Sequence, residues 1–295
     1  MYVVRNAFKL VQVLEFLHNY INYFLAFNTI HGVTPCIVLL KLEILMFNIA
    51  DYLKIIIVFH KRYPSCPIML QQPDVYVPIL AGKSDVTKDI EPFIKGMHCD
   101  NEGNDNISWM NPYFNEVTGM YWAWRHFDKI GNPRFIGTHH YRRFFEPKDI
   151  IEVFKGKIVV NMEKEYFEEA SVLNYFFGAN IIDNMIKLVH TNLDMNNDFV
   201  KKCFTEFMQW DYQYNREMFV CPWGIFDALM RYLVGMFPYL SQHVYYGHPY
   251  PKYYRNMSYV IEVMIGFFFY CLEKSGMFKL HKASYFYFYP EGYEK

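Results

Sequence analysis

The sequence predicts an α/β fold in which helices flank a mostly parallel sheet. Residues 52–59 form a continuous run rich in β-branched side chains, which is typical of a strand buried on both faces. Predicted strands then alternate with predicted helices, the order that builds a parallel sheet. Polar and basic residues follow two of these strands directly, where open α/β sheets bind ligands. Residues 51–295 contain no internal repeat or linker, so we expect a single domain there.

The first predicted elements end near residue 127. A short strand at residues 75–80 contains Pro78, which favours an edge position because proline cannot donate to a strand ladder. The polar loop at residues 82–106 is either a solvated loop or a metal-binding loop, since it carries several acidic side chains. Asn111 as N-cap and Pro112 at the first helical position then predict one helix that runs to about residue 127.

The remaining elements continue the alternation. A turn at residues 131–133 leads into the segment 134–145, which combines a short strand with a polar end. Further strands are expected at residues 157–162, 216–221 and 278–289. Further helices are expected at residues 163–180, 181–190, 199–210, 223–237 and 255–272, and residues 241–254 form a loop rich in Tyr, His and Pro.

The composition limits the class of protein. Hydrophobic residues make up 53% and aromatic residues 20% of the 295 residues, which suits a large core and fits either carbohydrate handling or ordinary packing. The net charge of -1 argues against nucleic acid as a partner. The six cysteines show no Cys-x-x-Cys spacing, which argues against a zinc site or disulfide framework. This cysteine pattern favours a cytoplasmic location.

Residues 1–50 read differently from the rest and are predicted to be an extension outside the main domain. They are apolar, but charged and amide side chains interrupt them, so they contain no clean membrane span and no signal peptide. Three interpretations stay open. The segment is an amphipathic surface that contacts the membrane peripherally, an extra helical hairpin, or the result of a start codon placed too early, with Met46 as the true start.

Two strand ends carry the residues expected to form a functional site. Residues 60–62 read His-Lys-Arg, and residues 139–143 read His-His-Tyr-Arg-Arg. Arginine grips phosphate in a bidentate manner, so we expect an anionic ligand such as a nucleotide diphosphate between the two strand ends. Tyr63 or Tyr141 is a candidate for stacking on the base. The alternative is that Arg142 and Arg143 form salt bridges with internal carboxylates.

Other reaction classes lack their motifs. The chain has neither a Gly-rich phosphate loop nor a Gly-x-Ser-x-Gly elbow, which weakens kinase, nicotinamide-enzyme and hydrolase interpretations. Neighbouring residues on a strand point to opposite faces, so at most one of His139 and His140 is expected in the cleft. Metal binding by this pair is therefore a minor alternative.

Several motifs together carry a resemblance to a known family. The helix motif and the His-Tyr-Arg-Arg strand end form the specific part of this resemblance, which covers about residues 52–288 and leaves out residues 1–50. The matching positions are Ile55 to Ile57 with His60 and Lys61; Asn106 to Ser108; Asn115, Glu116, Thr118, Tyr121 and Trp124; Gly137 with His140 to Phe145; residues 214–219; and Arg255, Tyr259 and Glu262. The chain resembles the bacterial capsular and exopolysaccharide glycosyltransferases long catalogued as a domain of unknown function.

The resemblance implies a glycosyltransferase A-like fold that binds a nucleotide-sugar donor. Its donor and phosphate ligands are implied to be His60, Lys61, Asn115, His140, Tyr141, Arg142 and Arg143. The Asp-x-Asp metal motif of such enzymes is missing here, so no cofactor is certain, although a divalent cation stays open. Arg142, Arg143 and His140 are expected to supply the charge that a cation supplies elsewhere.

The resemblance also suggests candidates for the acid–base chemistry. Glu262 is the candidate general base for the acceptor hydroxyl, although the family's Ser-Glu-Arg triplet is Ile-Glu-Val here. Glu116 is the competitor, with capping of its helix as its alternative role. Asn215 and Arg255 are expected to contact or support the acceptor.

The implied function is transfer of a sugar from a nucleotide-sugar donor, expected to be UDP-linked, to a growing surface polysaccharide or lipid-linked saccharide. The implied place is the cytoplasm, at the inner face of the membrane. The alternative is a non-catalytic protein of the same fold that binds a nucleotide sugar or carbohydrate.

Overall fold

The computed structural model describes residues 49–84, 90–161, 197–208, 217–243 and 256–289. The predictions for residues 1–48, for the helices at 163–180 and 181–190, and for most of the 241–254 loop lie outside these residues. Within them, no helix is long and apolar enough to cross a membrane.

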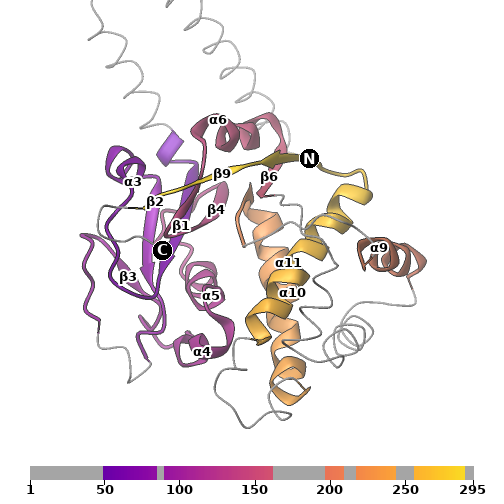
Figure 1. Ribbon diagram of the computed structural model, residues 1–295, viewed down its shortest axis with the longest axis horizontal. Helices are drawn as coiled ribbons and strands as arrows, with labels where there is room; N and C mark the ends of the chain where they lie inside the picture. The colour runs from indigo at the N-terminus through magenta and orange to yellow at the C-terminus, as the bar shows by residue number, and fades with distance from the viewer. Residues whose placement is uncertain (1–48, 85–89, 162–196, 209–216, 244–255, 290–295) are drawn as a thin grey trace, which may run out of the picture.

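One mixed sheet of nine strands organises the described part of the chain (Figure 1). Its main path runs β3-β2-β1-β4-β7-β6-β8, and β5 and β9 extend it from β4. The strands are β1 Leu53–Phe59, β2 Tyr76–Leu80, β3 His98–Cys99, β4 Phe135–His140, β5 Arg143–Phe145, β6 Lys157–Asn161, β7 Phe219–Pro222, β8 Lys279–Ala283 and β9 Tyr285–Tyr287. The predicted fold class, an α/β sheet flanked by helices, is confirmed.

Strand β1 is the centre of the parallel half of the sheet. It pairs in parallel with β2 on one side and with β4 on the other. Its residues alternate between two cores: Ile56 and Val58 face one, and Ile55 and Ile57 face the other. A run of apolar side chains without alternation fits this position because both faces of the strand are buried.

Strand β2 is an edge strand at Pro78 but not at its carboxyl end. Within the described residues, no strand pairs with the outer side of β2 at Pro78. Strand β2 pairs with β3, but only through Ile79 and Leu80. Pro78 pairs with Ile57 of β1 on the other side. The short β3 therefore leaves the outer side of β2 open where proline has no hydrogen to donate.

The sheet reverses direction at β7. Strand β7 runs antiparallel to both β4 and β6. Gly137 of β4 permits the close approach, because a Cβ atom there would lie 2.9 Å from the Phe219 carbonyl oxygen. As a result, the residues before β7 reach the edge where β1 and β4 end.

The two faces of the sheet are covered differently (Figure 1). On one face lie the long helices α10 (Trp223–His243) and α11 (Asn256–Lys274), together with α9 (Asp198–Met208) and α5 (Val117–Arg125), which enclose a large apolar core. The other core is smaller and contains residues of α3 (Pro67–Gln71), α6 (Pro147–Ile150) and the 3-10 helix η2 (Ile151–Lys155).

Two elements that were predicted as continuous are interrupted in the structure. The helix expected from residue 111 to 127 is η1 (Ser108–Met110), α4 (Asn111–Phe114) and α5, with a break at Asn115, where φ is 45°. Met110, not Asn111, precedes the first turn of α4. The strand expected at residues 278–289 is two strands, β8 and β9, which pair with different neighbours.

Candidate functional site

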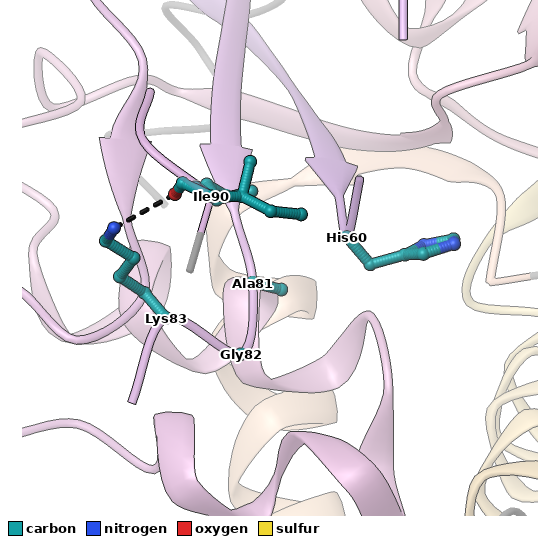
Figure 2. A pocket seen from close by; sticks show the side chains of 6 residues that line it. His60, Ala81, Gly82, Lys83 and Ile90 are labelled. Atoms are coloured by element: carbon teal, nitrogen blue, oxygen red, sulfur yellow. Dashed lines mark hydrogen bonds between the residues drawn. The ribbon is translucent and has the colours of Figure 1, made fainter. Parts of the chain in front are cut away.

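The carboxyl ends of the parallel strands meet at one edge of the sheet and carry a small pocket. The residues that line it are His60, Leu80, Ala81, Gly82, Lys83 and Ile90. Figure 2 shows that Lys83 donates a hydrogen bond to the Ile90 carbonyl, at 2.9 Å, and that the His60 side chain points away from both. This end of the site thus combines apolar walls with backbone groups and a cation.

The buried carboxylate of Asp100 fixes this edge. It accepts hydrogen bonds from the backbone amides of Gly82 (2.7 Å) and Lys83 (3.2 Å), from the Ser108 hydroxyl, and from the Thr118 hydroxyl (2.7 Å). Asp100 is 0% exposed. Its role is therefore structural. At this position the 82–106 loop is neither solvated nor metal-binding, as the two interpretations expected, but buried and hydrogen-bonded within the protein. No cluster of three or more potential metal ligands is present in the described residues.

His140 and Glu116 face each other at the end of β4. The distance from His140 Nε2 to Glu116 Oε1 is 3.7 Å, and both side chains are largely buried. The Arg142 amide donates to His140 Nδ1 at 3.2 Å, so the neutral ring carries its proton on Nε2, toward Glu116. Glu116 makes no side-chain cap bond to α5, so the predicted capping role is not seen.

Gly119 allows Glu116 to reach this position. A Cβ atom at Gly119 would lie 2.8 Å from Val58, so the first turn of α5 packs directly on the end of β1. Because β1 and β4 are neighbours, with Val58 paired to His140, this contact sets the start of α5 over the end of β4.

Two further glutamates join Glu116. The pKa of Glu217 is raised well above its usual value, first by burial and then by the negative charges of Glu116 and Glu262. Glu217 thus lies within electrostatic reach of both carboxylates. The pocket here is lined by Val58, Glu116, Met120, Thr138, His139, His140 and Glu217.

Helix α11 is tied to the α4–α5 break by one hydrogen bond. The Asn115 side-chain amide donates to the Ser258 hydroxyl at 2.7 Å. Glu262 follows Ser258 by four residues on α11, so both face the same side of the helix. This bond helps to hold α11 where Glu262, like Glu116, lies within electrostatic reach of Glu217. The predicted role of Asn115 in donor binding stays a prediction.

Backbone strain marks the same region. Asn115 and Glu217 adopt positive φ values, 45° and 56°, which non-glycine residues rarely adopt. The Thr138 hydroxyl donates a short hydrogen bond to the Glu217 carbonyl and so holds that residue against β4. Such residues gather at functional sites because the surrounding structure must hold them in place.

His139 points to the opposite face of β4, as predicted. Its ring packs against the rings of Tyr76, Phe144 and Phe145, and neither ring nitrogen has a hydrogen-bond partner in the described structure. Burial lowers the pKa of His139 to about 3. His139 is therefore a neutral core residue.

The tyrosines proposed for base stacking are buried instead. Tyr63 and Tyr141 are 4% and 2% exposed and pack edge to face, with centroids 4.9 Å apart. Tyr141 also contacts the rings of His60 and His140. The stacking prediction for this pair is corrected: Tyr141 joins the two predicted strand ends by packing between them. Lys61 is exposed, and its Nζ lies 5.9 Å from the centre of this ring.

The two arginines diverge. The Arg142 guanidinium carbon lies 5.1 Å from the Tyr141 ring centre, whereas that of Arg143 lies 5.1 Å from the Tyr287 ring centre on β9. Within the described residues, neither arginine forms a salt bridge. The alternative of internal carboxylate partners is thus not seen. Arg142 stays beside His140 and Tyr141, whereas Arg143 turns toward β9.

The structure brings together His60, Lys61, Asn115, Glu116, His140, Tyr141, Arg142 and Glu262 along one edge. Asn215 and Arg255 lie outside the described residues. Sequence reasoning missed Glu217 and Ser258, and it considered Asp100 only as part of a solvated or metal-binding loop. The segment containing Glu217 carries part of the family resemblance, which was the available signal for that residue.

The fold and this edge together define an α/β protein with a candidate site at the carboxyl ends of its parallel strands. A family model described as a domain of unknown function (DUF4422) matches residues 54–273. The match covers more than half of the chain, so the protein belongs to this family.

A solved structure has the same fold. The apo structure of the bifunctional glycosyltransferase WbbM is similar to this chain, with a TM-score of 0.60 and 17% sequence identity. The match covers 80% of this chain and 45% of that chain, so this protein corresponds to less than half of WbbM. No curated protein matches the sequence.

Proposed function

We propose that this protein is a glycosyltransferase that moves a sugar from a nucleotide-sugar donor to a saccharide acceptor. The observation that carries the proposal is the group of carboxylates at the edge where the parallel strands end. Glu116 lies 3.7 Å from His140, and Glu116 and Glu262 both act electrostatically on the buried Glu217. Cationic side chains lie along the same edge. Carboxylates that can take up a proton, next to cations that can hold a diphosphate, are what sugar transfer requires.

In the proposed reaction, the acceptor hydroxyl oxygen bonds to the anomeric carbon of the donor. The bond from that carbon to the diphosphate oxygen breaks, and the electron pair leaves with the nucleotide diphosphate. Glu262 takes the hydroxyl proton. Arg142, with His60 and Lys61, stabilises the negative charge of the leaving diphosphate. Glu116 is the second candidate base, with His140 as its partner.

Donor binding is assigned to the His60 and Lys83 end of the site. Figure 2 shows a small pocket at the ends of β1 and β2, where apolar side chains lie beside His60 and Lys83. This is the mixture that holds a flat, hydrogen-bonding ligand. A UDP-linked sugar is the first donor to test, and a lipid-linked saccharide of a surface polysaccharide is the first acceptor.

The described residues hold no ligand cluster suited to a divalent cation. We therefore route no step of the reaction through a metal ion. Transfer activity that is abolished by chelation and restored by manganese would contradict the assignment of leaving-group charge to Arg142, His60 and Lys61.

A thermal-shift screen against nucleoside diphosphates and nucleotide sugars, followed by a transfer assay with the best donor, tests the proposal. A ligand at 100 times its dissociation constant adds about 2.7 kcal/mol to stability, which is easily measured. We expect both stabilisation and transfer or donor hydrolysis. Stabilisation without any turnover identifies a non-catalytic binder, and no stabilisation by any nucleotide overturns the proposal.

A further inference from the structure

Trp109 is a large aromatic side chain that the fold leaves in solvent. It is 63% exposed, although the residue before it, Ser108, is completely buried. Tryptophan is highly buried on average, so an exposed one is more informative than an exposed leucine. Trp109 belongs to neither hydrophobic core of the described residues, so packing of the fold does not account for an aromatic residue at this position.

The backbone that carries Trp109 is held from several sides. The Ser108 hydroxyl donates to Asp100 and accepts a hydrogen bond from the Ser84 amide at 3.0 Å. The Ser108 amide donates to the Asn106 side chain at 3.3 Å. The indole is therefore presented from a fixed turn, which lowers the entropy cost of binding a ligand against it.

The turn lies between the two halves of the candidate site. Ser84, which binds Ser108, follows Lys83 of the pocket in Figure 2. In the other direction, η1 leads directly into α4, which ends at the Asn115 break beside Glu116. Trp109 thus stands on the rim that connects the proposed donor pocket with the carboxylates.

The loop that precedes the Trp109 turn is polar. Residues 102–106 read Glu-Gly-Asn-Asp-Asn, and residues 103–105 are exposed. Ile107 and Met110, which flank Trp109, are partly buried against the core, so the indole stands out as a single exposed ring in this turn. Protein partners bind larger, contiguous apolar patches of several hundred Å² or more. A flat apolar surface bordered by hydrogen-bonding groups instead suits a saccharide, which has an apolar ring face and peripheral hydroxyls.

We propose that Trp109 is a saccharide-binding residue that stacks its indole on a sugar ring of the acceptor at the rim of the site. The assignment of the bound saccharide as the acceptor rests on the proposed function, whereas saccharide binding at Trp109 does not.

The test is saturation-transfer NMR on the full chain, with cellohexaose and maltohexaose as probes of β- and α-linked pyranose chains. We expect saccharide signals with the wild-type protein and about fivefold weaker binding in Trp109→Ala, the loss expected for one ring contact. Leu70→Ala is the matched control, because Leu70 is 69% exposed on α3. This control is expected to bind the saccharides as the wild-type protein does.

Three outcomes overturn the inference. These are no saccharide signal with either probe, equal signals from the wild-type protein and Trp109→Ala, and an equal loss in Leu70→Ala. A change of oligomeric state in Trp109→Ala without loss of saccharide binding would identify a contact between copies instead. Equal melting temperatures confirm that both variants fold. Failure of the proposed function appears separately, as a lack of stabilisation by nucleotides.

Discussion

The two faces of β4 place neighbouring histidines in opposite environments. His139 is enclosed by aromatic rings and neither of its ring nitrogens has a partner, whereas His140 lies 3.7 Å from Glu116 beside two other acidic residues. One step along a strand thus separates a residue that packs in the core from one that faces the candidate site. The motif His-His-Tyr-Arg-Arg is therefore not one functional unit, because its residues lie in the core, at the candidate site and against β9.

The largest expected effect lies on the His140 face. We expect Glu262→Gln to lower kcat for sugar transfer by about 10²–10⁴-fold, because the amide cannot take the acceptor proton. The measurement is initial rate at saturating donor and acceptor. Glu273→Gln is the matched control on the same helix and is expected to keep full activity. If Glu116→Gln shows the large loss and Glu262→Gln does not, the roles of the two residues exchange.

Glu217 tests the electrostatics of the same face. Its pKa is raised in the folded protein, so folded Glu217 keeps a proton that the unfolded chain loses above about pH 4.5. Stability is therefore lost as the pH rises from that value toward the raised pKa. We expect Glu217→Gln to melt at a higher temperature than the wild-type protein at pH 8 and at nearly the same temperature near pH 4.5. A difference in melting temperature independent of pH would refute this account.

His139 tests the packing face, with the opposite dependence on pH. Its pKa falls from 6.5 to about 3 on folding, so stability is present above pH 6.5 and is lost as the pH drops below that value. From pH 6.5 to pH 5 the expected loss is about 2 kcal/mol. His139→Phe removes this loss, which urea unfolding at pH 7 and pH 5 measures. Tyr76→Phe, which removes a buried hydroxyl that also lacks a partner, is expected to change stability equally at both pH values.

The smallest expected effect concerns how α11 is held. Ser258→Ala removes the hydrogen bond from Asn115 and is expected to cost about 1 kcal/mol of stability. Because this bond holds the helix that carries Glu262, kcat is expected to fall while the KM of the donor stays the same. Ser275→Ala is the control for loss of a hydroxyl. Ser275 directly follows the last residue of α11, and its hydroxyl donates to the Leu272 carbonyl, away from the site. A change in donor KM with unchanged kcat would argue against a positioning role.

The sequence predicted the parallel part of the fold well because its signals are local. The apolar run of β1 and the turn before β4 depend on neighbouring residues only, and the alternation of His139 and His140 follows from strand geometry. The break at Asn115 could not be predicted, because its side-chain partner, Ser258, lies 143 residues away. Local propensity alone favoured a continuous helix there.

Glu217 was missed for a topological reason. In a parallel sheet the residues that follow a strand form the ligand site, so a residue that precedes a strand is not expected there. Strand β7 is antiparallel, so the residues that precede it reach the same edge. Only the order of strands in space shows this. The burial of Tyr63 and Tyr141 could not be predicted for a different reason, because tyrosine occurs both in cores and in ligand sites.

Asp100 makes the rim of the site a single cooperative unit. One carboxylate joins the loop after β2, the turn that carries Trp109 and the helix that begins at Glu116. These segments are therefore expected to open together, with one free energy for local unfolding. A nucleotide that binds near Lys83 then slows amide hydrogen exchange at Thr118 as well, and so stabilises the acceptor end of the site before any acceptor arrives.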